Sequence, residues 1–195
     1  MRDGKQTTLN CLKMKPPLSE IIDDLLVRYL AYFNYKSYAQ RINLQGNEKI
    51  LEIGCGGGNL SRFLAERLSQ GELVCIDYSE YCIDKAKRRL RSFENIRLEL
   101  TDFLDFNKEN YFDIAVIHYV LHDIIEREKA IGTLRNSLKR KAIVYIREPL
   151  RESHGMSSEE IRKLMSLKGF FEDKSEEGYY FPIRGKTYDG VFRKQ

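Results

Sequence analysis

Residues 50–61 read ILEIGCGGGNLS, and this stretch decides the fold of the chain. Ile50, Leu51 and Ile53 are typical of a buried strand, which ends at a cluster of glycines. Beyond the cluster, apolar residues recur at helical spacing: Leu60, Phe63, Leu64 and Leu68. The stretch therefore predicts a strand, a tight turn and a helix.

The turn is suited to a ligand that lies against the backbone, because Gly54, Gly56 and Gly58 allow positive φ and lack Cβ atoms. The N–H groups at the start of the next helix would face that ligand. A nicotinamide fingerprint needs a glycine at the sixth position, where this chain has Asn59, and a phosphate-binding P-loop needs a lysine. The remaining pattern is acidic-x-Gly-x-Gly-x-Gly, with Glu52 as the acid; the alternative is a turn that serves packing alone.

A second strand over residues 72–77 ends in an acid, Asp77. Asp77 follows Gly58 by 19 residues, a separation that suits one crossover helix. An acidic residue at this place accepts hydrogen bonds from ribose hydroxyls in nucleotide-binding sheets. The alternative is an acid that only precedes the helix predicted over 79–90. Two such features at this separation favour a nucleoside site.

The acidic-glycine pattern resembles motif I of the class I S-adenosylmethionine-dependent methyltransferases, and the resemblance extends over most of the chain. A third strand over 96–100 precedes Thr101-Asp102-Phe103, and a fourth over 111–117 precedes His118-Tyr119-Val120-Leu121-His122-Asp123. The latter segment resembles the Leu-His-His or Leu-His-Glu segment of small-molecule members, including ubiquinone and menaquinone C-methyltransferases. The resemblance implies an α/β fold: a Rossmann-like, seven-stranded, mostly parallel sheet with helices on both faces, an antiparallel last strand and an N-terminal helical lid.

The resemblance also implies S-adenosyl-L-methionine as the cofactor and no metal. Tyr78 would pack on the adenine, Asp102 would bind its amino group and Phe103 would lie against the ring edge. For Asp102 an ordinary turn or N-cap role is the alternative. The implied cofactor-binding residues are Glu52, Gly54, Cys55, Gly56, Gly58, Asp77, Tyr78, Asp102, Phe103 and His118.

Methyl transfer from a sulfonium is an in-line displacement, and the protein contributes mainly by positioning the reactants. If the acceptor must lose a proton, His122 is the first candidate base and His118 the second. A structural role is the alternative for both. The expected acceptor contacts are Tyr35, which ends an aromatic helix predicted over 20–35, and Tyr38, which follows it. Arg147 and His154, after a fifth strand over 142–146, are the other two. Core packing of the tyrosines and pairing of Arg147 and His154 with nearby acids are the alternatives.

The chain divides into a flexible arm over 1–18 and a single methyltransferase domain over 19–195. Within the domain we expect a helical lid over 19–45 and a cofactor-binding core over 46–150. The part over 151–195 should hold a substrate-side loop, a last helix capped by Ser157 or Ser158, and antiparallel strands near 171–176 and 187–193. Residues 178–182 fit neither strand.

The composition indicates which partners and environments to expect. The 195 residues include 33 basic and 29 acidic side chains, which gives a net charge of +4. Nucleic-acid binding usually requires a clustered basic face and is not indicated by a small overall excess. Four cysteines without a Cys-x-x-Cys pair fit a reduced, cytoplasmic protein without zinc, and no apolar run is long enough to span a membrane. The Asn/Asp-Pro-Pro-Tyr signature of amide- and adenine-N-methylating relatives is absent from the sequence, which makes those substrates less expected.

We therefore expect a methyltransferase that acts on a small-molecule acceptor. The alternatives are an RNA or protein methyltransferase, or a non-catalytic S-adenosylmethionine-binding regulatory module. The oligomeric state stays open.

Overall fold

The computed structural model describes residues 18–150, 155–180 and 185–195. In these ranges one seven-stranded sheet runs in the order β3-β2-β1-β4-β5-β7-β6. Strands β1 to β5 are parallel, and β7 lies antiparallel between β5 and β6. The predicted α/β class with its antiparallel last strand is confirmed. The strands are β1 Lys49–Ile53, β2 Glu72–Asp77, β3 Ile96–Leu100, β4 Phe112–His118, β5 Leu138–Pro149, β6 Phe170–Tyr180 and β7 Gly185–Lys194.

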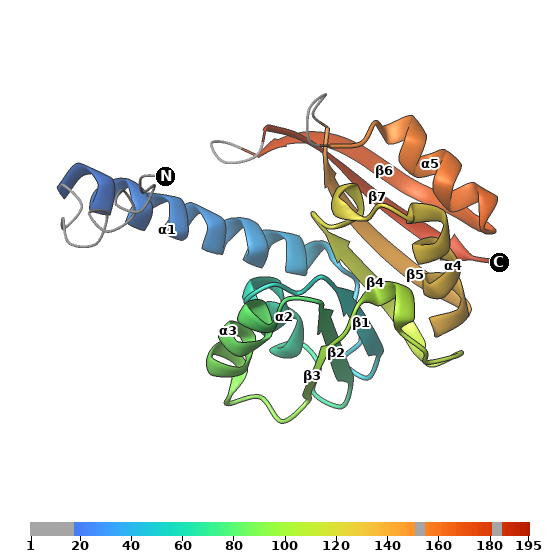
Figure 1. Ribbon diagram of the computed structural model, residues 1–195, viewed down its shortest axis with the longest axis horizontal. Helices are drawn as coiled ribbons and strands as arrows, with labels where there is room; N and C mark the ends of the chain where they lie inside the picture. Colours follow the sequence, from blue (N-terminus) through green and yellow to red (C-terminus); the bar gives the residue numbers. More distant parts are fainter. Residues whose placement is uncertain (1–17, 151–154, 181–184) are drawn as a thin grey trace, which may run out of the picture.

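Helices cover both faces of the sheet, with α1, α2 and α3 on one face and α4 and α5 on the other (Figure 1). The N-terminal part of α1 extends beyond the edge of the sheet. Short 3-10 helices follow β3 and β4, at the edge where the parallel strands end. The helices are α1 Leu18–Arg41, α2 Asn59–Ala65, α3 Glu80–Leu90, η1 Phe103–Asp105, η2 Leu121–Asp123, α4 Arg127–Ser137 and α5 Ser158–Leu167.

The central strands are apolar because helices bury them from both sides. Along β1, Leu51 and Ile53 belong to the core under α4 and α5, whereas Ile50 belongs to the core under α1 to α3. All three side chains are at most 2% exposed. This burial holds β1 in the centre of the sheet, so that the glycine turn which follows it lies at the carboxyl edge of the sheet.

Helix α1 and strand β5 are longer than the sequence pattern indicates. Helix α1 continues past Tyr35 to Arg41, and β5 covers 138–149 instead of 142–146. The end of β5 pairs with β7 from Ile143 to Pro149, so Arg147, which was expected just after the strand, lies within it. Long-range pairing of this kind extends a strand beyond its apolar run.

The C-terminal part contains the predicted helix and strand pair. Ser157 caps α5 in a capping box with Glu160: its Oγ accepts from the Glu160 N–H at 3.1 Å. Gly178 to Tyr180 continue β6. Residues 181–182, His154 and residues 1–17 of the expected arm lie outside the described residues.

Over the described ranges, no helix combines the length and the apolar character needed to cross a membrane.

Candidate functional site

The glycine turn after β1 is held open by the acid that ends β2. Gly54, Gly56 and Gly58 have φ of 66°, 52° and 75°. The Asp77 carboxylate accepts hydrogen bonds from the Gly56 N–H at 2.8 Å and from the Ser79 N–H at 2.9 Å. Asp77 is only 8% exposed. The two features singled out in the sequence therefore meet and shape one backbone cradle.

The three glycines of the turn have different surroundings. A Cβ added to Gly54 would lie 2.4 Å from a Val120 methyl, and one added to Gly58 would lie 2.8 Å from Leu90. These two positions need glycine for close packing as well as for positive φ. A Cβ on Gly56 would meet no atom within 4 Å, so this part of the turn faces open space. Gly56 is therefore where a ligand can approach the backbone.

A cavity of about 390 Å³, named here the nucleoside cavity, lies beside the turn at the carboxyl edge of the sheet. Five of the predicted cofactor residues line it: Gly54, Asp77, Tyr78, Asp102 and Phe103. The remaining walls include Tyr119, Val120 and Asp123, which follow β4. The volume falls within the range of small-ligand pockets.

The side chains at the β2 and β3 ends differ in their exposure. Tyr78 is 82% exposed and offers a ring face to the cavity, whereas Phe103 is 7% exposed and belongs to the core. The Asp102 carboxylate accepts from the Leu104 N–H at 2.9 Å and caps η1. Asp102 thus has the N-cap role that was the alternative to binding the adenine amino group. It also lines the cavity, so both roles are compatible with its position.

Two predicted cofactor residues, Glu52 and Cys55, lie in the core beneath the turn, and neither is among the side chains that line the nucleoside cavity. Glu52 is 2% exposed, and the Cys75 thiol lies 3.4 Å from its Oε2 atom. Burial raises the pKa of the Glu52 carboxyl to about 7. The hydrogen bond from the Cys75 thiol partly offsets this rise, and the nearby charge of Asp77 adds to it. Glu52 therefore supports the turn from below.

This raised pKa predicts an unusual pH dependence of stability. The folded chain keeps the Glu52 proton to about pH 7, whereas the unfolded chain loses it near the ordinary glutamate pKa of 4.5. Between these values the folded state binds more protons, so the free energy of unfolding falls as pH rises, by about 3 kcal/mol at most. Urea unfolding should show that Glu52→Gln gains stability relative to wild type between about pH 5 and pH 8.

Glu94→Gln is the matched control, because Glu94 is exposed and its loss should leave the wild-type pH slope unchanged. If Glu52→Gln and Glu94→Gln follow the same pH slope, Glu52 is not protonated in the folded state.

A second buried carboxylate organises the turn after β4. Glu148, near the end of β5, is fully buried, and its Oε1 accepts from the Val120 N–H at 2.8 Å and from the Leu121 N–H at 2.7 Å. Its Oε2 lies 2.6 Å from His122 Nδ1. Arg127 binds the same turn from the other side, donating to the carbonyls of Leu121 at 3.2 Å and His122 at 2.9 Å. We name Glu148, Arg127 and the turn they hold the carboxylate clamp.

The clamp fixes a backbone that is unfavourable on its own. Tyr119 adopts a φ of 60°, the left-handed region that side chains other than glycine rarely occupy. Its N–H donates to the Arg147 carbonyl at 2.8 Å. The next residue, Val120, is the one that packs against Gly54. The clamp therefore sets the wall of the nucleoside cavity that faces the glycine turn.

The predicted residues His118, Tyr35 and Tyr38 form an aromatic cluster at the end of β4. The His118 ring lies 5.2 Å from the Tyr35 ring and 4.9 Å from the Tyr38 ring, between centroids. The Arg147 guanidinium lies 4.0 Å from the Tyr38 ring centroid. This cluster fastens the C-terminal end of α1 to the sheet, beside the nucleoside cavity and outside the residues that line it.

Arg147 is fully buried and forms a bidentate ion pair with Asp189 of β7. Pairing with a nearby acid was the alternative to its expected contact with the substrate. A bidentate guanidinium–carboxylate pair holds both side chains in one orientation. Arg147 thereby supports Tyr38 from below, and its contact with an acceptor stays a prediction.

Sequence reasoning assigned no role to Glu148, Arg127, Val120 or Asp189. The role of Glu148 could have been inferred from its position. Glu148 lies near the end of β5, which pairs parallel with β4, and the carboxyl ends of parallel strands lie at one edge of the sheet. The role of Asp189 could not have been inferred from the sequence. Asp189 is 42 positions from Arg147, and the two residues meet only because β7 inserts beside β5.

Comparison with known proteins agrees with this geometry. Residues 44–184 match a family model described as a methyltransferase domain. The chain is 27% identical over 173 residues to a carboxy-S-adenosyl-L-methionine synthase of Helicobacter pylori (strain G27), covering 83% of this chain and 70% of the relative.

Solved structures share the fold. An S-adenosylmethionine-dependent methyltransferase from Aquifex aeolicus superposes with a TM-score of 0.75 at 17% identity, covering 94% of this chain and all of that one. The N-methyltransferase NodS from Bradyrhizobium japonicum WM9, in complex with S-adenosyl-L-homocysteine, has a TM-score of 0.70 at 20% identity, covering 83% and 86% of the two chains.

Proposed function

The chain belongs to the class I S-adenosylmethionine-dependent methyltransferase family, and from this premise we propose that it methylates a small-molecule acceptor by in-line displacement. One observation carries the choice of acceptor. Every charged side chain that lines the nucleoside cavity in the described ranges is acidic: Asp77, Asp102 and Asp123. Carboxylates attract a cationic sulfonium, whereas a polyanion such as RNA needs basic contacts. The acidic edge therefore favours a small acceptor over a nucleic acid.

The cofactor would take its place along the row of strand ends. In this proposal the Asp77 carboxylate, which has capacity for further hydrogen bonds, accepts from the two ribose hydroxyls. The exposed ring of Tyr78 stacks on the adenine and Asp102 accepts from its amino group. The open backbone at Gly56 leaves room for the ligand.

Bound S-adenosylmethionine supplies an activated methyl group whose sulfur is already an excellent leaving group. The chain's own residues then have to hold the acceptor in line, a role that we assign to the clamp and the aromatic cluster. In our proposal Tyr35 and Tyr38 contact the acceptor from the side of α1. Their rings already lie against His118 at the end of β4.

If the acceptor carries a proton that must leave, we assign its removal to His122. Glu148 Oε2, at 2.6 Å, orients the ring and makes Nδ1 the donor, so the lone pair is on Nε2. Nε2 lies 3.4 Å from Asp123 Oδ1, and Asp123 lines the nucleoside cavity. A proton accepted at Nε2 would leave an imidazolium between two carboxylates, which stabilise its charge.

A transfer assay tests the choice of acceptor. The protein is incubated with methyl-labelled S-adenosylmethionine and, separately, with fractionated metabolites, total RNA and a protein extract. We expect label in the metabolite fraction and none above background in the polymers. Label in RNA or protein would contradict the proposal, and S-adenosylhomocysteine binding without label in any fraction would favour a regulatory module. Asp77→Asn is the inactive control and Asp84→Asn, an exposed carboxylate of α3, the matched active one.

A further inference from the structure

Among the described residues, three aromatic side chains line the nucleoside cavity: Tyr78, Phe103 and Tyr119. The exposed ring of Tyr78 is assigned to the adenine, and Phe103 is only 7% exposed and belongs to the core. Tyr119 is partly buried, and neither the sequence pattern nor the proposed binding mode gives it a function. Its ring is therefore the aromatic surface of the cavity that still needs an explanation.

The order of the strands places Tyr119 relative to the cofactor. Tyr119 directly follows β4, Asp77 ends β2, and β1 lies between these two strands. Neighbouring strands are about 4.8 Å apart, so the two strand ends are about 10 Å apart. In the binding mode proposed above, on which this inference rests, the adenine lies at Asp102 after β3 and the ribose lies at Asp77. The sulfonium sulfur is bonded to C5′ of the ribose, so continuing along the row of strand ends brings it between Asp77 and Tyr119.

The backbone and a neighbouring ring hold Tyr119 in place. Its left-handed φ of 60° is fixed by the hydrogen bond from its N–H to the Arg147 carbonyl and by the packing of the next residue, Val120, against Gly54. The His118 ring lies 4.4 Å from the Tyr119 ring between centroids, and the two planes are inclined by 81°. Since the rings are nearly perpendicular, His118 covers at most one face of the Tyr119 ring. The orientation of the ring is thus set before a ligand binds.

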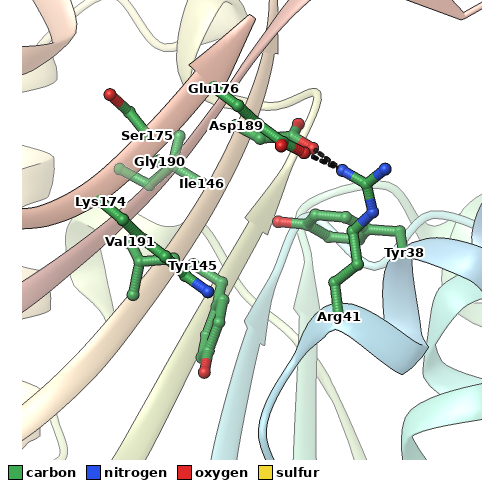
Figure 2. Close-up of a pocket in the computed structure, with 10 residues that line it drawn as sticks. All are labelled: Tyr38, Arg41, Tyr145, Ile146, Lys174, Ser175, Glu176, Asp189, Gly190 and Val191. Carbon is green, nitrogen blue, oxygen red and sulfur yellow. Dashed lines mark hydrogen bonds and ion pairs between the residues drawn. The ribbon is translucent and has the colours of Figure 1, made fainter. Parts of the chain in front are cut away.

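The other tyrosines next to His118 do not line the nucleoside cavity. Tyr38 belongs to a second cavity, of about 310 Å³, which shares no lining residue with the first. Figure 2 shows Tyr38 in this second cavity, across from Tyr145. Tyr35 lines neither of the two cavities. Of the three tyrosines in contact with His118, Tyr119 is therefore the one that is placed to touch the cofactor.

We propose that the Tyr119 ring contacts the sulfonium of S-adenosylmethionine and makes the site prefer the charged cofactor to its uncharged product, S-adenosylhomocysteine. The face of an aromatic ring attracts a cation that lies within about 6 Å of its centroid. The thioether of S-adenosylhomocysteine carries no charge and gains nothing from this attraction. Tyr119 is then a specificity-determining residue, which strengthens binding of the donor and leaves the product free to dissociate.

Substitutions of Tyr119 test the proposal by isothermal titration calorimetry of the full chain with S-adenosylmethionine and with S-adenosylhomocysteine. Tyr119→Leu removes the ring and should lower the affinity for S-adenosylmethionine about fivefold, with less than about twofold change for S-adenosylhomocysteine. Tyr119→Phe keeps the ring and should bind both compounds within about twofold of the wild type. Tyr119→Asn removes the ring with a residue that tolerates a left-handed backbone, so it should fold and show the same selective loss as Tyr119→Leu.

Tyr179→Leu is the matched control, because Tyr179 is 81% exposed on β6 and does not line the nucleoside cavity. It should leave both affinities unchanged. Equal losses for the two compounds in Tyr119→Leu and Tyr119→Asn, no loss for either compound, or a loss in Tyr119→Phe as large as in Tyr119→Leu would overturn the proposal. Failure of the cofactor site itself gives a different result, since the wild type would then bind neither compound, and this would refute the site and the contact together.

Discussion

Asp77→Asn weakens the binding of S-adenosylhomocysteine about 100-fold, the loss expected when two hydrogen bonds to a charged acceptor disappear at a cost of about 3 kcal/mol. Asparagine has nearly the shape of aspartate, but its amide nitrogen cannot accept. Either the Gly56 N–H or the Ser79 N–H, each now bonded to an Asp77 oxygen, would face a second donor. Isothermal titration calorimetry measures the change.

The control for this prediction is Asp84→Asn, which removes a carboxylate from the exposed face of α3. It should bind S-adenosylhomocysteine like the wild type. If Asp77→Asn binds within about twofold of the wild type, the Asp77 carboxylate does not hold the ribose and the assignment of the nucleoside cavity fails.

His122→Gln lowers the turnover of an acceptor that must lose a proton by about 100-fold, the lower end of the range for general-base catalysis. The glutamine amide can still donate to the Glu148 carboxylate, so the clamp should persist, yet it cannot take up a proton. The affinity for S-adenosylhomocysteine should stay within about twofold, because His122 does not line the nucleoside cavity in the described structure. Steady-state kinetics and calorimetry on one preparation measure both quantities.

Glu148→Gln separates orientation from proton transfer. Its oxygen can still accept from the Val120 and Leu121 N–H groups, but its amide would face His122 Nδ1 with a donor. We expect a lower kcat with little change in KM, and an altered pH profile of kcat.

One outcome would contradict the role of His122. If His122→Gln reduces affinity and turnover equally, His122 supports the fold of the turn and is not a base.

The sequence predicted the glycine turn and Asp77 because both signals are local. A strand buried on both faces is apolar throughout, so its apolar run is recognisable in the sequence. The tight turn that follows requires glycine at Gly54 and Gly58, and these residues can be identified without any tertiary information. The acids at the ends of β2 and β3 follow the same rule, since parallel strands end at one edge. Asp77 and Asp102 accordingly line one cavity.

The sequence could not predict what depends on contacts between distant segments. The bidentate pair of Arg147 with Asp189 exists only because β7 inserts beside β5, and this pairing extends β5 past Ile146, where the predicted strand ended. Glu52 matched the family pattern, yet its place in the core, outside the residues that line the nucleoside cavity, follows from packing against Ser61 and Cys75. A pattern match identifies the residue but not the direction of its side chain.

A crystal structure of the complex with S-adenosylhomocysteine tests whether the cofactor binds at the ends of β1 and β2. We expect the ribose hydroxyls to lie within hydrogen-bond distance of the Asp77 carboxylate and the ligand to pass over Gly56, where the turn is open. Density for the nucleoside in any other place, with Asp77 still bound only to the Gly56 and Ser79 N–H groups, would contradict this binding mode.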